Sequence, residues 1–512
     1  MTRDASCWHI FASIFVLLVF VFPVVGCGDD DDDNDDSDDV PNDDDVNDDV
    51  DDDLNDDNDD DVNDDLNDDV DDDDTAPVDP YAEMTPGGGT LDEILGISSH
   101  MSRGAAYNWK REFEIEKLVE AGVKMVRTDF HWYSIEPEDD VWNFDGLDTM
   151  TDLCLASGLD VTAIFLGSPD WATPGGTADE IDPAQYADYT GKVAEHFADR
   201  IDHYEFWNEQ NTTRFWKPEP NPDKYGELLK AVYESVHDND PDASVIFGGL
   251  SPLEVNFFDP RGIWNFIHRV HEFHPDICDY FDVLSIHPYT FLQQPSPEFD
   301  LDLGIYHFPT TVGFIDLARS TLADIGCPDK RLQFTEMGWP SLIIGDQRQA
   351  AYLAHSMMMA LANDIEIYDW YTFWDGSGGA SLPTEDYFGL FTYPGDTQDT
   401  EAKESFLALR GAHRLLGDSR YAGDLRPALY LDTNVYALVF ADDQGMWTVA
   451  LWRGGPAIWE EKNIVVPLPA GTDGSWTLFD QSGDEIESGI SENGEVEVAV
   501  TGITQYLRFF LN

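Results

Sequence analysis

The stretch Asp202-His203-Tyr204-Glu205-Phe206-Trp207-Asn208, together with the two segments that follow it, decides the fold class. Residues 202–208 and 244–249 are short apolar runs rich in aromatic and β-branched side chains, which is typical of buried strands. Residues 222–238 between them have helical length and open on Pro222-Asp223, a first-turn proline. This order predicts two parallel strands joined by a crossover helix.

The same alternation extends from residue 92 to residue 416. It predicts strands at 95–100, 124–129, 159–167, 202–208, 244–249, 281–287, 331–336 and 366–374. It also predicts helices at 109–121, 145–157, 183–199, 222–238, 262–274, 311–325, 347–363 and 401–416. These strand–helix pairs predict an α/β fold, a (β/α)8 TIM barrel, in residues 92–419. The alternative is an open doubly wound sheet, but no glycine-rich phosphate loop follows the first strand.

Residues 420–512 follow a different pattern. Short apolar segments such as 435–440, 447–452 and 496–500 alternate with polar turns such as Asp442-Asp443-Gln444-Gly445. Ala428-Leu429-Tyr430-Leu431 is predicted to form the first strand. The spacing predicts a small all-β sandwich. Covering one side of the barrel is its simpler role, and carbohydrate binding is the alternative.

The N-terminal residues predict export. Arg3 precedes an apolar run at 11–22 that is short for a membrane span, and the small residue Gly26 precedes Cys27. This arrangement resembles the lipobox of bacterial lipoproteins, which implies a signal peptide over residues 1–27 and lipidation of Cys27. The alternatives are an uncleaved anchor and an ordinary signal peptide with an incidental cysteine. We expect an exported, membrane-anchored lipoprotein at the bacterial cell surface or in the periplasm.

The acidic charge is concentrated near the N-terminus. Residues 29–74 contain 30 of the 104 acidic residues and no Lys or Arg, which leaves −47 of the net charge of −77 for the rest. Residues 28–91 therefore predict a disordered, Asp-rich tether, because such a charge density opposes collapse. Calcium binding is the weaker alternative, since residues 29–74 offer no glycine for a tight ligating turn. The remaining negative charge argues against nucleic acid and favours a neutral substrate.

Three cysteines remain beyond the signal peptide and Cys27. Cys154 lies in the apolar run Leu153-Cys154-Leu155 and is interpreted as a small buried hydrophobic residue. Cys278 and Cys327 each precede a predicted strand, the sixth and the seventh, and adjacent parallel strands bring their entry points together. A disulfide outside the cytoplasm is one hypothesis, and two free thiols are the other.

Two predicted strands end in acids. The fourth ends at Asn208-Glu209 and the seventh at Thr335-Glu336, both at the edge of the barrel where active sites lie. Strands that are three apart in an eight-stranded ring place such side chains on facing walls. Two carboxyl groups about 5–5.5 Å apart cleave a glycosidic bond with retention, one as nucleophile and the other as acid.

The surrounding motifs strengthen this interpretation. Trp207-Asn208-Glu209-Gln210-Asn211 resembles the acid/base motif of the clan A glycoside hydrolases, and Thr335-Glu336-Met337-Gly338-Trp339-Pro340 resembles their nucleophile motif. The similarity covers residues 92–415 and is nearest to family 39, with family 5 next. Gln210 departs from the Pro found in many members, which affects the family placement and not the acid.

The resemblance implies a role for each matching residue. Glu209 is the expected acid/base and Glu336 the expected nucleophile. Substrate-binding residues are expected around these two acids. Arg127 is expected to hold Glu336 ionised, and Tyr289 to donate a hydrogen bond to the same carboxylate. Asn208 is expected to reach the sugar 2-hydroxyl, and Trp374 to form the floor under the sugar. His100, His287 and Trp171 are further candidates for sugar contact. Trp132, Trp216 and Trp339 are either subsite walls or packing, and Glu205 is expected to lie lower in the barrel or to face outward.

We therefore expect a retaining glycoside hydrolase that acts on β-linked oligo- or polysaccharides. No cluster of ligand residues with metal spacing is evident in the sequence, so we expect neither a metal nor a cofactor. The expected partner is the carbohydrate substrate, with contact to the membrane only through the lipid, and the chain is expected to be a monomer. The alternatives are a non-catalytic carbohydrate-binding protein on the same barrel and a transglycosylase that uses the same acids.

Overall fold

The computed structural model describes residues 79–103, 108–252, 262–290, 296–298, 301–302, 307–378, 383–395, 399–455 and 459–511. The predicted signal peptide, Cys27 and the tether as far as residue 78 lie outside these ranges. Within them, no helix combines the length and the apolar character needed to cross a bilayer.

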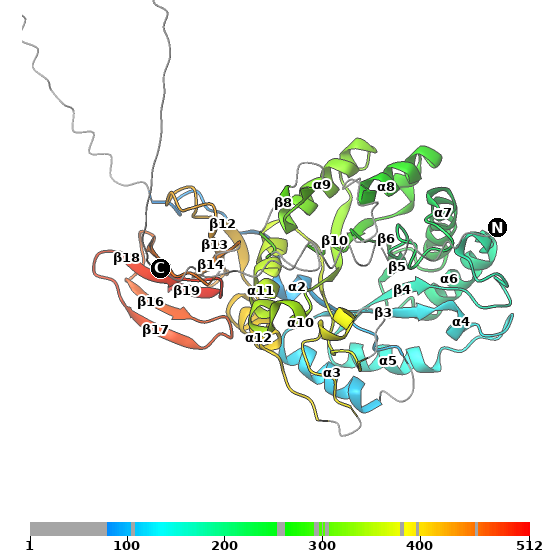
Figure 1. The fold of residues 1–512 in the computed structure, drawn as a ribbon, viewed down its shortest axis with the longest axis horizontal. Helices are drawn as coiled ribbons and strands as arrows, with labels where there is room; N and C mark the ends of the chain where they lie inside the picture. Colours follow the sequence, from blue (N-terminus) through cyan, green and yellow to red (C-terminus); the bar gives the residue numbers. More distant parts are fainter. Residues whose placement is uncertain are drawn as a thin grey trace, which may run out of the picture. The chain divides into compact units, whose positions relative to one another are not determined.

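Eight parallel strands close into a barrel, as predicted (Figure 1). Strand β11 pairs with both β10 and β2 and so joins the end of the ring to its beginning. Each strand overlaps one of the predicted segments, because the apolar runs that mark them are buried on both faces. The strands are β2 (Leu95–Ser98), β3 (Met125–His131), β4 (Asp160–Leu166), β5 (His203–Asn208), β6 (Ser244–Leu250), β7 (Val283–Ile286), β10 (Arg331–Met337) and β11 (Tyr368–Tyr371).

The predicted helices surround these strands in Figure 1. Two begin as the sequence indicates, since the Asp182 side chain accepts from the Ala184 and Gln185 amides, and the Asn221 side chain accepts from the Lys224 amide. The helices are α3 (Asn108–Glu120), α5 (Asp145–Ala156), α6 (Pro183–Phe197), α7 (Pro222–Asn239), α8 (Gly262–Phe273), α9 (Thr311–Asp324), α11 (Asp346–Ala362) and α12 (Glu404–Leu416).

Short elements lie between them and mostly follow the strand ends. They are α2 (Leu91–Ile94), α4 (Trp132–Ile135), η3 (Ala178–Glu180), η4 (Ile277–Tyr280), β8 (Leu301–Asp302), β9 (His307–Phe308), α10 (Ser341–Ile344) and η5 (Pro383–Tyr387).

The C-terminal residues form antiparallel sheets. A seven-stranded sheet has the order β1-β12-β13-β14-β19-β16-β17, and β15 pairs with β18 in a second sheet, consistent with the predicted sandwich. The strands are β1 (Gly87–Thr90), β12 (Arg420–Asp424), β13 (Val435–Ala441), β14 (Met446–Arg453), β15 (Lys462–Pro467), β16 (Ser475–Phe479), β17 (Glu485–Ile490), β18 (Glu495–Val500) and β19 (Gln505–Phe510). Ala428 to Leu431 was wrongly predicted as a strand, since it follows β12 as a turn.

The boundary between tether and folded chain also needs correction. Residues 79–91 were assigned to the tether, but β1 pairs with β12 at the edge of the C-terminal sheet. Tyr81 is buried against the rings of Trp447 and Phe509, and its hydroxyl donates to the Pro467 carbonyl at 2.9 Å. This aromatic contact orders a segment whose local composition resembles a linker.

The sandwich shares a hydrophobic core with the barrel. Leu438, Phe440 and Trp452 belong to the same buried cluster as the barrel strands and α11. The Trp452 indole stacks on His355 of α11 and donates to the Glu298 carboxylate at 2.7 Å. Packing against the barrel is therefore one function of this region.

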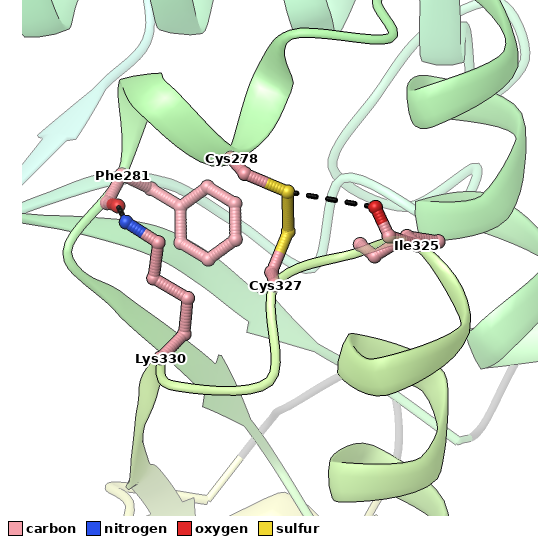
Figure 2. Close-up of a disulfide and its surroundings, with 5 residues drawn as sticks. All are labelled: Cys278, Phe281, Ile325, Cys327 and Lys330. Atoms are coloured by element: carbon pink, nitrogen blue, oxygen red, sulfur yellow. Dashed lines mark hydrogen bonds between the residues drawn. A yellow bond between two sulfur atoms is a disulfide. The ribbon is translucent and has the colours of Figure 1, made fainter.

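The structure contains the hypothesised disulfide between Cys278 and Cys327 (Figure 2). The two Cα atoms are 5.6 Å apart, a usual separation for a bridge. Cys278 belongs to η4 before β7, and Cys327 lies in the turn before β10, so the bridge joins the entry ends of two paired strands. Cys154 is free and fully buried, as interpreted from the sequence.

The bridge is expected to stabilise the barrel. It closes a loop of 49 residues, so a double variant Cys278→Ser/Cys327→Ser should lose up to about 4 kcal/mol of unfolding free energy through loop-closure entropy. Urea unfolding of the two proteins measures this difference. Reduction of the wild type should reproduce it, and equal midpoints for wild type and variant would contradict it.

Candidate active site

A cavity of about 460 Å³ opens at the carboxyl ends of the barrel strands. Glu209 and Glu336 line it from facing walls, at the end of β5 and within the last residues of β10. Their side chains are 10% and 14% exposed, so both carboxylates reach the cavity while most of each is shielded from water. One carboxylate oxygen of Glu209 and one of Glu336 lie within 4.8 Å of each other.

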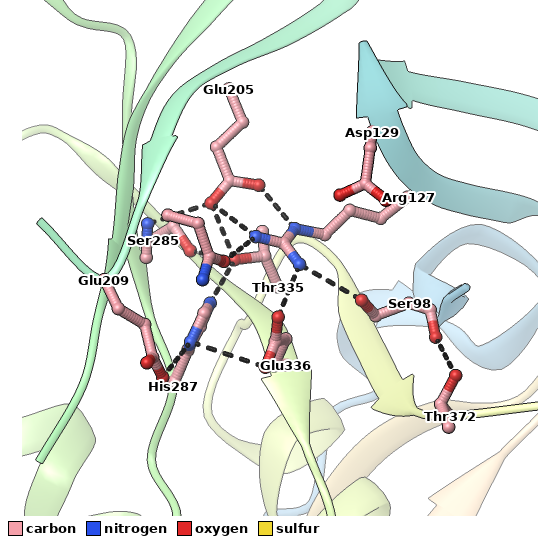
Figure 3. A network of polar contacts seen from close by, with 12 residues as sticks. Ser98, Arg127, Asp129, Glu205, Glu209, Ser285, His287, Thr335, Glu336 and Thr372 are labelled. Atoms are coloured by element: carbon pink, nitrogen blue, oxygen red, sulfur yellow. Dashed lines mark hydrogen bonds and ion pairs between the residues drawn. The ribbon is translucent and has the colours of Figure 1, made fainter. Parts of the chain in front are cut away.

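His287 lies between the two acids and contacts both, as Figure 3 shows. Its Nδ1 lies 3.1 Å from Glu209 Oε1 and 3.7 Å from Glu336 Oε2, and its Nε2 lies 3.1 Å from the Thr335 hydroxyl. The ring is fully buried, and a Cβ on Gly249 would lie 2.0 Å from it, so the close approach requires glycine there. His287 is therefore placed to orient Glu209 rather than to contact a sugar directly.

Arg127 on β3 holds the nucleophile candidate. Its Nη1 donates to Glu336 Oε1 at 2.8 Å and to the Ser98 hydroxyl at 3.0 Å. Burial lowers the pKa of the guanidinium, but the charges of Glu205 and Glu336 raise it above its ordinary value. Arg127 thus places a permanent positive charge beside Glu336, in line with the prediction.

Glu205, for which no role was predicted, fixes Arg127 from the other side. Its carboxylate accepts from Arg127 Nε at 2.5 Å and from Nη2 at 3.1 Å, which is a bidentate pair. The Gly249 amide and the Thr335 hydroxyl also donate to it. Glu205 was expected either low inside the barrel or facing outward, and the structure places it inside the barrel. Its place four residues before Glu209 on the same strand was the available signal.

The backbone at the end of β5 explains why neighbouring residues face one cavity. In a regular strand Asn208 and Glu209 would point to opposite faces. Trp207 and Glu209 instead have φ values of 71° and 46°, in the left-handed region that non-glycine residues rarely adopt. Asn208 can therefore accept from Arg127 Nη2 at 2.8 Å while Glu209 also lines the cavity. Such strain is commonly found at functional sites.

Tyr289, in the loop after β7, donates to Glu336 Oε2 at 3.0 Å. Burial acts to raise the pKa of Glu336, but His287, Arg127 and this hydrogen bond together hold it below its ordinary value. Burial and the neighbouring Glu336 charge raise the pKa of the Tyr289 phenol, so it remains a donor. Glu336 is thereby kept ionised, as a nucleophile requires.

Removing this donor should change the pH dependence of catalysis. In Tyr289→Phe the ionised form of Glu336 loses a hydrogen bond, so its pKa rises and the acid limb of the kcat/KM profile moves to higher pH, by about one unit. Initial rates across pH measure the shift. Tyr430→Phe, at a 94% exposed position, is the control. An unmoved acid limb in Tyr289→Phe would contradict the proposed contact.

The cavity wall includes charged residues for which no role was predicted. Asp129 at the end of β3 accepts from His100 Nδ1 at 3.0 Å and from Arg103 Nε at 2.8 Å. Burial acts to raise the pKa of Asp129, but these two partners and His131 lower it. Asp129 follows Arg127 by two residues on one strand, which is the signal that sequence reasoning passed over. His100, a candidate for sugar contact, lines the cavity.

The predicted aromatic floor is wrong in detail. Trp374 lies past the end of β11 and lines a neighbouring cavity, not the catalytic one. Tyr371 lines the catalytic cavity in its place. Trp171 is also absent from this wall, because its indole donates to the Glu136 carbonyl at 3.1 Å and packs on Trp132. The remaining tryptophan candidates are fully buried packing residues, namely Trp132, Trp216 and Trp339.

Among the described residues, one group has donor atoms close enough for a metal ion, namely Glu209, His287 and Glu336. These atoms already have protein partners, since Arg127 and Tyr289 contact Glu336 and His287 contacts Glu209. The guanidinium supplies the positive charge that an ion would otherwise provide. The arrangement therefore fits a pair of carboxyl groups with distinct roles better than a ligand set.

Comparison with known proteins agrees with this geometry. A glycoside hydrolase family 42 model described as beta-galactosidase matches residues 104–208, and no curated protein sequence matches the chain. A family 39 glycoside hydrolase from the gut symbiont Bacteroides cellulosilyticus WH2 superposes with a TM-score of 0.63 at 22% identity over 83% of this chain and 82% of its own. A monomeric beta-xylosidase from Caulobacter crescentus CB15 gives 0.60 at 14% identity, over 84% and 98%.

A GH30 endoxylanase from Clostridium papyrosolvens C71 gives a TM-score of 0.54 at 12% identity, over 83% of this chain and 98% of its own. At these identities the likeness shows a shared fold. The barrel is similar to those of the clan A glycoside hydrolases. Within that clan, the similar structures include members of families 39 and 30.

Proposed function

We propose that the protein is a retaining glycoside hydrolase that cleaves O-glycosidic bonds of β-linked oligo- or polysaccharides. The observation that carries the proposal is the approach of Glu209 and Glu336, whose nearest oxygens lie within 4.8 Å. Retaining enzymes have carboxyl groups about 5–5.5 Å apart, whereas inverting enzymes need about 6.5–9.5 Å to admit a water. The short separation of Glu209 and Glu336 therefore supports retention rather than inversion.

The residues then divide the reaction between them. Glu336 attacks the anomeric carbon and forms a glycosyl-enzyme ester, while the proton of Glu209 passes to the departing glycosidic oxygen. In the second step Glu209 takes a proton from water, and the water oxygen replaces Glu336 at the same carbon. Arg127 and Tyr289 stabilise the Glu336 carboxylate when it leaves. Asn208, held by Arg127, offers its amide to the sugar 2-hydroxyl.

Trapping the covalent intermediate tests the proposal. The chain from residue 79 onward is incubated with aryl 2-deoxy-2-fluoro β-glycosides of glucose, galactose, xylose and mannose, and peptides are mapped by mass spectrometry. An adduct on Glu336 is expected from at least one sugar, which names the donor. An adduct on another carboxylate would overturn the assignment of the nucleophile.

Two further outcomes concern the alternatives. Absence of any adduct, together with no release of sugar from a polysaccharide panel, would favour a carbohydrate-binding protein without turnover. Loss of activity on chelation would indicate that the Glu209, His287 and Glu336 group holds a metal, and we expect the rate to be unchanged by EDTA.

We also propose that the enzyme is anchored through a lipid on Cys27, which lies outside the described residues. The support is the sequence Val24-Val25-Gly26-Cys27 after the apolar run, followed by an acidic tether. Cys27→Ala expressed in a bacterial host should move the protein from the membrane fraction to the soluble fraction or leave its signal uncleaved. Membrane retention of a cleaved Cys27→Ala protein would contradict the anchor.

A further inference from the structure

A second cavity adjoins the catalytic one. Its volume is about 210 Å³, and it shares Ser99, His100, Tyr371 and Glu385 with the catalytic cavity. The shared residues make the two spaces neighbours along a common wall rather than separate pockets. The smaller volume suits one additional ring and not a long segment of chain.

The walls of this second cavity combine aromatic rings with buried charge. Trp374 is held rigidly, because its ring stacks on Phe113 with centroids 5.5 Å apart and its indole donates to Glu114 at 3.1 Å. Tyr393 lines the cavity from another loop, with the Lys110 ammonium 4.4 Å from its ring centroid. Flat apolar faces beside hydrogen-bonding groups are what the C–H faces and hydroxyls of a pyranose require.

The polar groups are built into the fold rather than displayed on the surface. Lys110, Arg111 and Glu114 project from α3 and are 8%, 5% and 3% exposed. The Glu114 carboxyl accepts from the Ser99 hydroxyl and the Trp374 indole. Burial raises the pKa of Glu114 to about 7, against the lowering effect of those hydrogen bonds and of Arg111 and Lys110. Charged groups are rarely buried, so their concentration in the wall of a cavity favours ligand recognition there.

The position of the second cavity around the closed ring of barrel strands decides which side of the substrate it receives. Its residues follow β2 and β11, which are adjacent, and β5 lies across the barrel from that pair. Glu209 at the end of β5 protonates the departing oxygen, so the leaving group lies beside β5. The second cavity therefore receives what is attached to the other end of the reacting sugar.

We propose that this cavity, formed by Trp374, Tyr393, Lys110 and Glu114, binds a second sugar unit on the non-reducing side of the cleaved bond. The inference rests on the proposed function of the neighbouring site. It makes the preferred substrate a chain with at least two β-linked units before the scissile bond. A single terminal sugar fills only part of the combined space.

The test compares four aryl glycosides of the donor sugar found by labelling. One is the β-monosaccharide, and the other three are the corresponding disaccharides with β-1,2, β-1,3 and β-1,4 linkages. The wild type should hydrolyse one disaccharide with a kcat/KM about 10-fold above that of the monosaccharide, because remote binding energy is used in the transition state. Release of the intact disaccharide shows that the aryl bond is the one cleaved.

Two variants assign the preference to the cavity. Ser377→Trp adds bulk at an exposed lining position, and Tyr393→Ala removes an aromatic wall. Each should lower the ratio of disaccharide to monosaccharide kcat/KM by about 10-fold, whereas Tyr430→Ala on the distant sandwich should leave both rates as in the wild type. A wild-type ratio near one, or an equal fall on both substrates in Ser377→Trp, overturns the second subsite alone. Turnover of neither substrate by the wild type overturns the proposed function, and this inference with it.

Discussion

Glu336→Gln is expected to lower kcat by at least about 10⁴-fold on every substrate, because the covalent step has no other nucleophile. The glutamine keeps the size of the side chain and can still contact Arg127 and Tyr289, so the loss reports chemistry rather than packing. Stopped assays with an aryl glycoside measure the residual rate. The 2-fluoro adduct should also disappear from the peptide that contains position 336.

A matched control separates this effect from the loss of a charge on the barrel. Glu366→Gln removes a carboxylate that pairs with Arg331 near the amino-terminal end of β10, away from the catalytic cavity. We expect wild-type kinetics from it. Residual activity above about one per cent in Glu336→Gln, with the fold intact by circular dichroism, would show that another group attacks the anomeric carbon.

Glu209→Gln is expected to have an effect that depends on the leaving group. A poor leaving group needs protonation, so its hydrolysis should fall by about 10³-fold. A dinitrophenolate departs unaided, so the first step should persist and the glycosyl-enzyme should accumulate, because water is no longer activated by a base. A burst of dinitrophenol followed by a slow steady state measures both consequences.

Azide gives the contrasting readout for Glu209. As an anion it needs no base, and it should enter the space left beside the variant side chain and restore steady-state turnover with a glycosyl azide of retained configuration. His287→Asn, which removes the ring that orients Glu209, should reduce the rate without making it responsive to azide. The assignment of Glu209 would fail if the variant lost the same factor on every leaving group.

The local sequence was sufficient for the barrel and for the two acids. Each barrel strand is an apolar run with both faces covered, and each helix has caps or periodicity of its own, so neighbours in sequence carry the signal. Glu209 and Glu336 lie inside short motifs at strand ends, where strand order alone places them on one rim. Arg127, Asn208, His287 and Tyr289 were expected at the site from the resemblance to the clan A glycoside hydrolases. The structure places each beside an acid or beside Arg127.

Only the tertiary structure decided the features that depend on distant segments. Glu205 became a partner of Arg127 because β5 and β3 project into one barrel interior, which no local pattern reveals. Trp374 lies outside the wall of the catalytic cavity, contrary to the prediction, because the chain turns after β11. Tyr371 lines that wall instead. β1 joined the C-terminal sheet through pairing over more than three hundred residues of chain. Local propensity selects strands and helices, whereas side-chain partners across a closed barrel are set by ring closure and burial, and these exist only in the assembled fold.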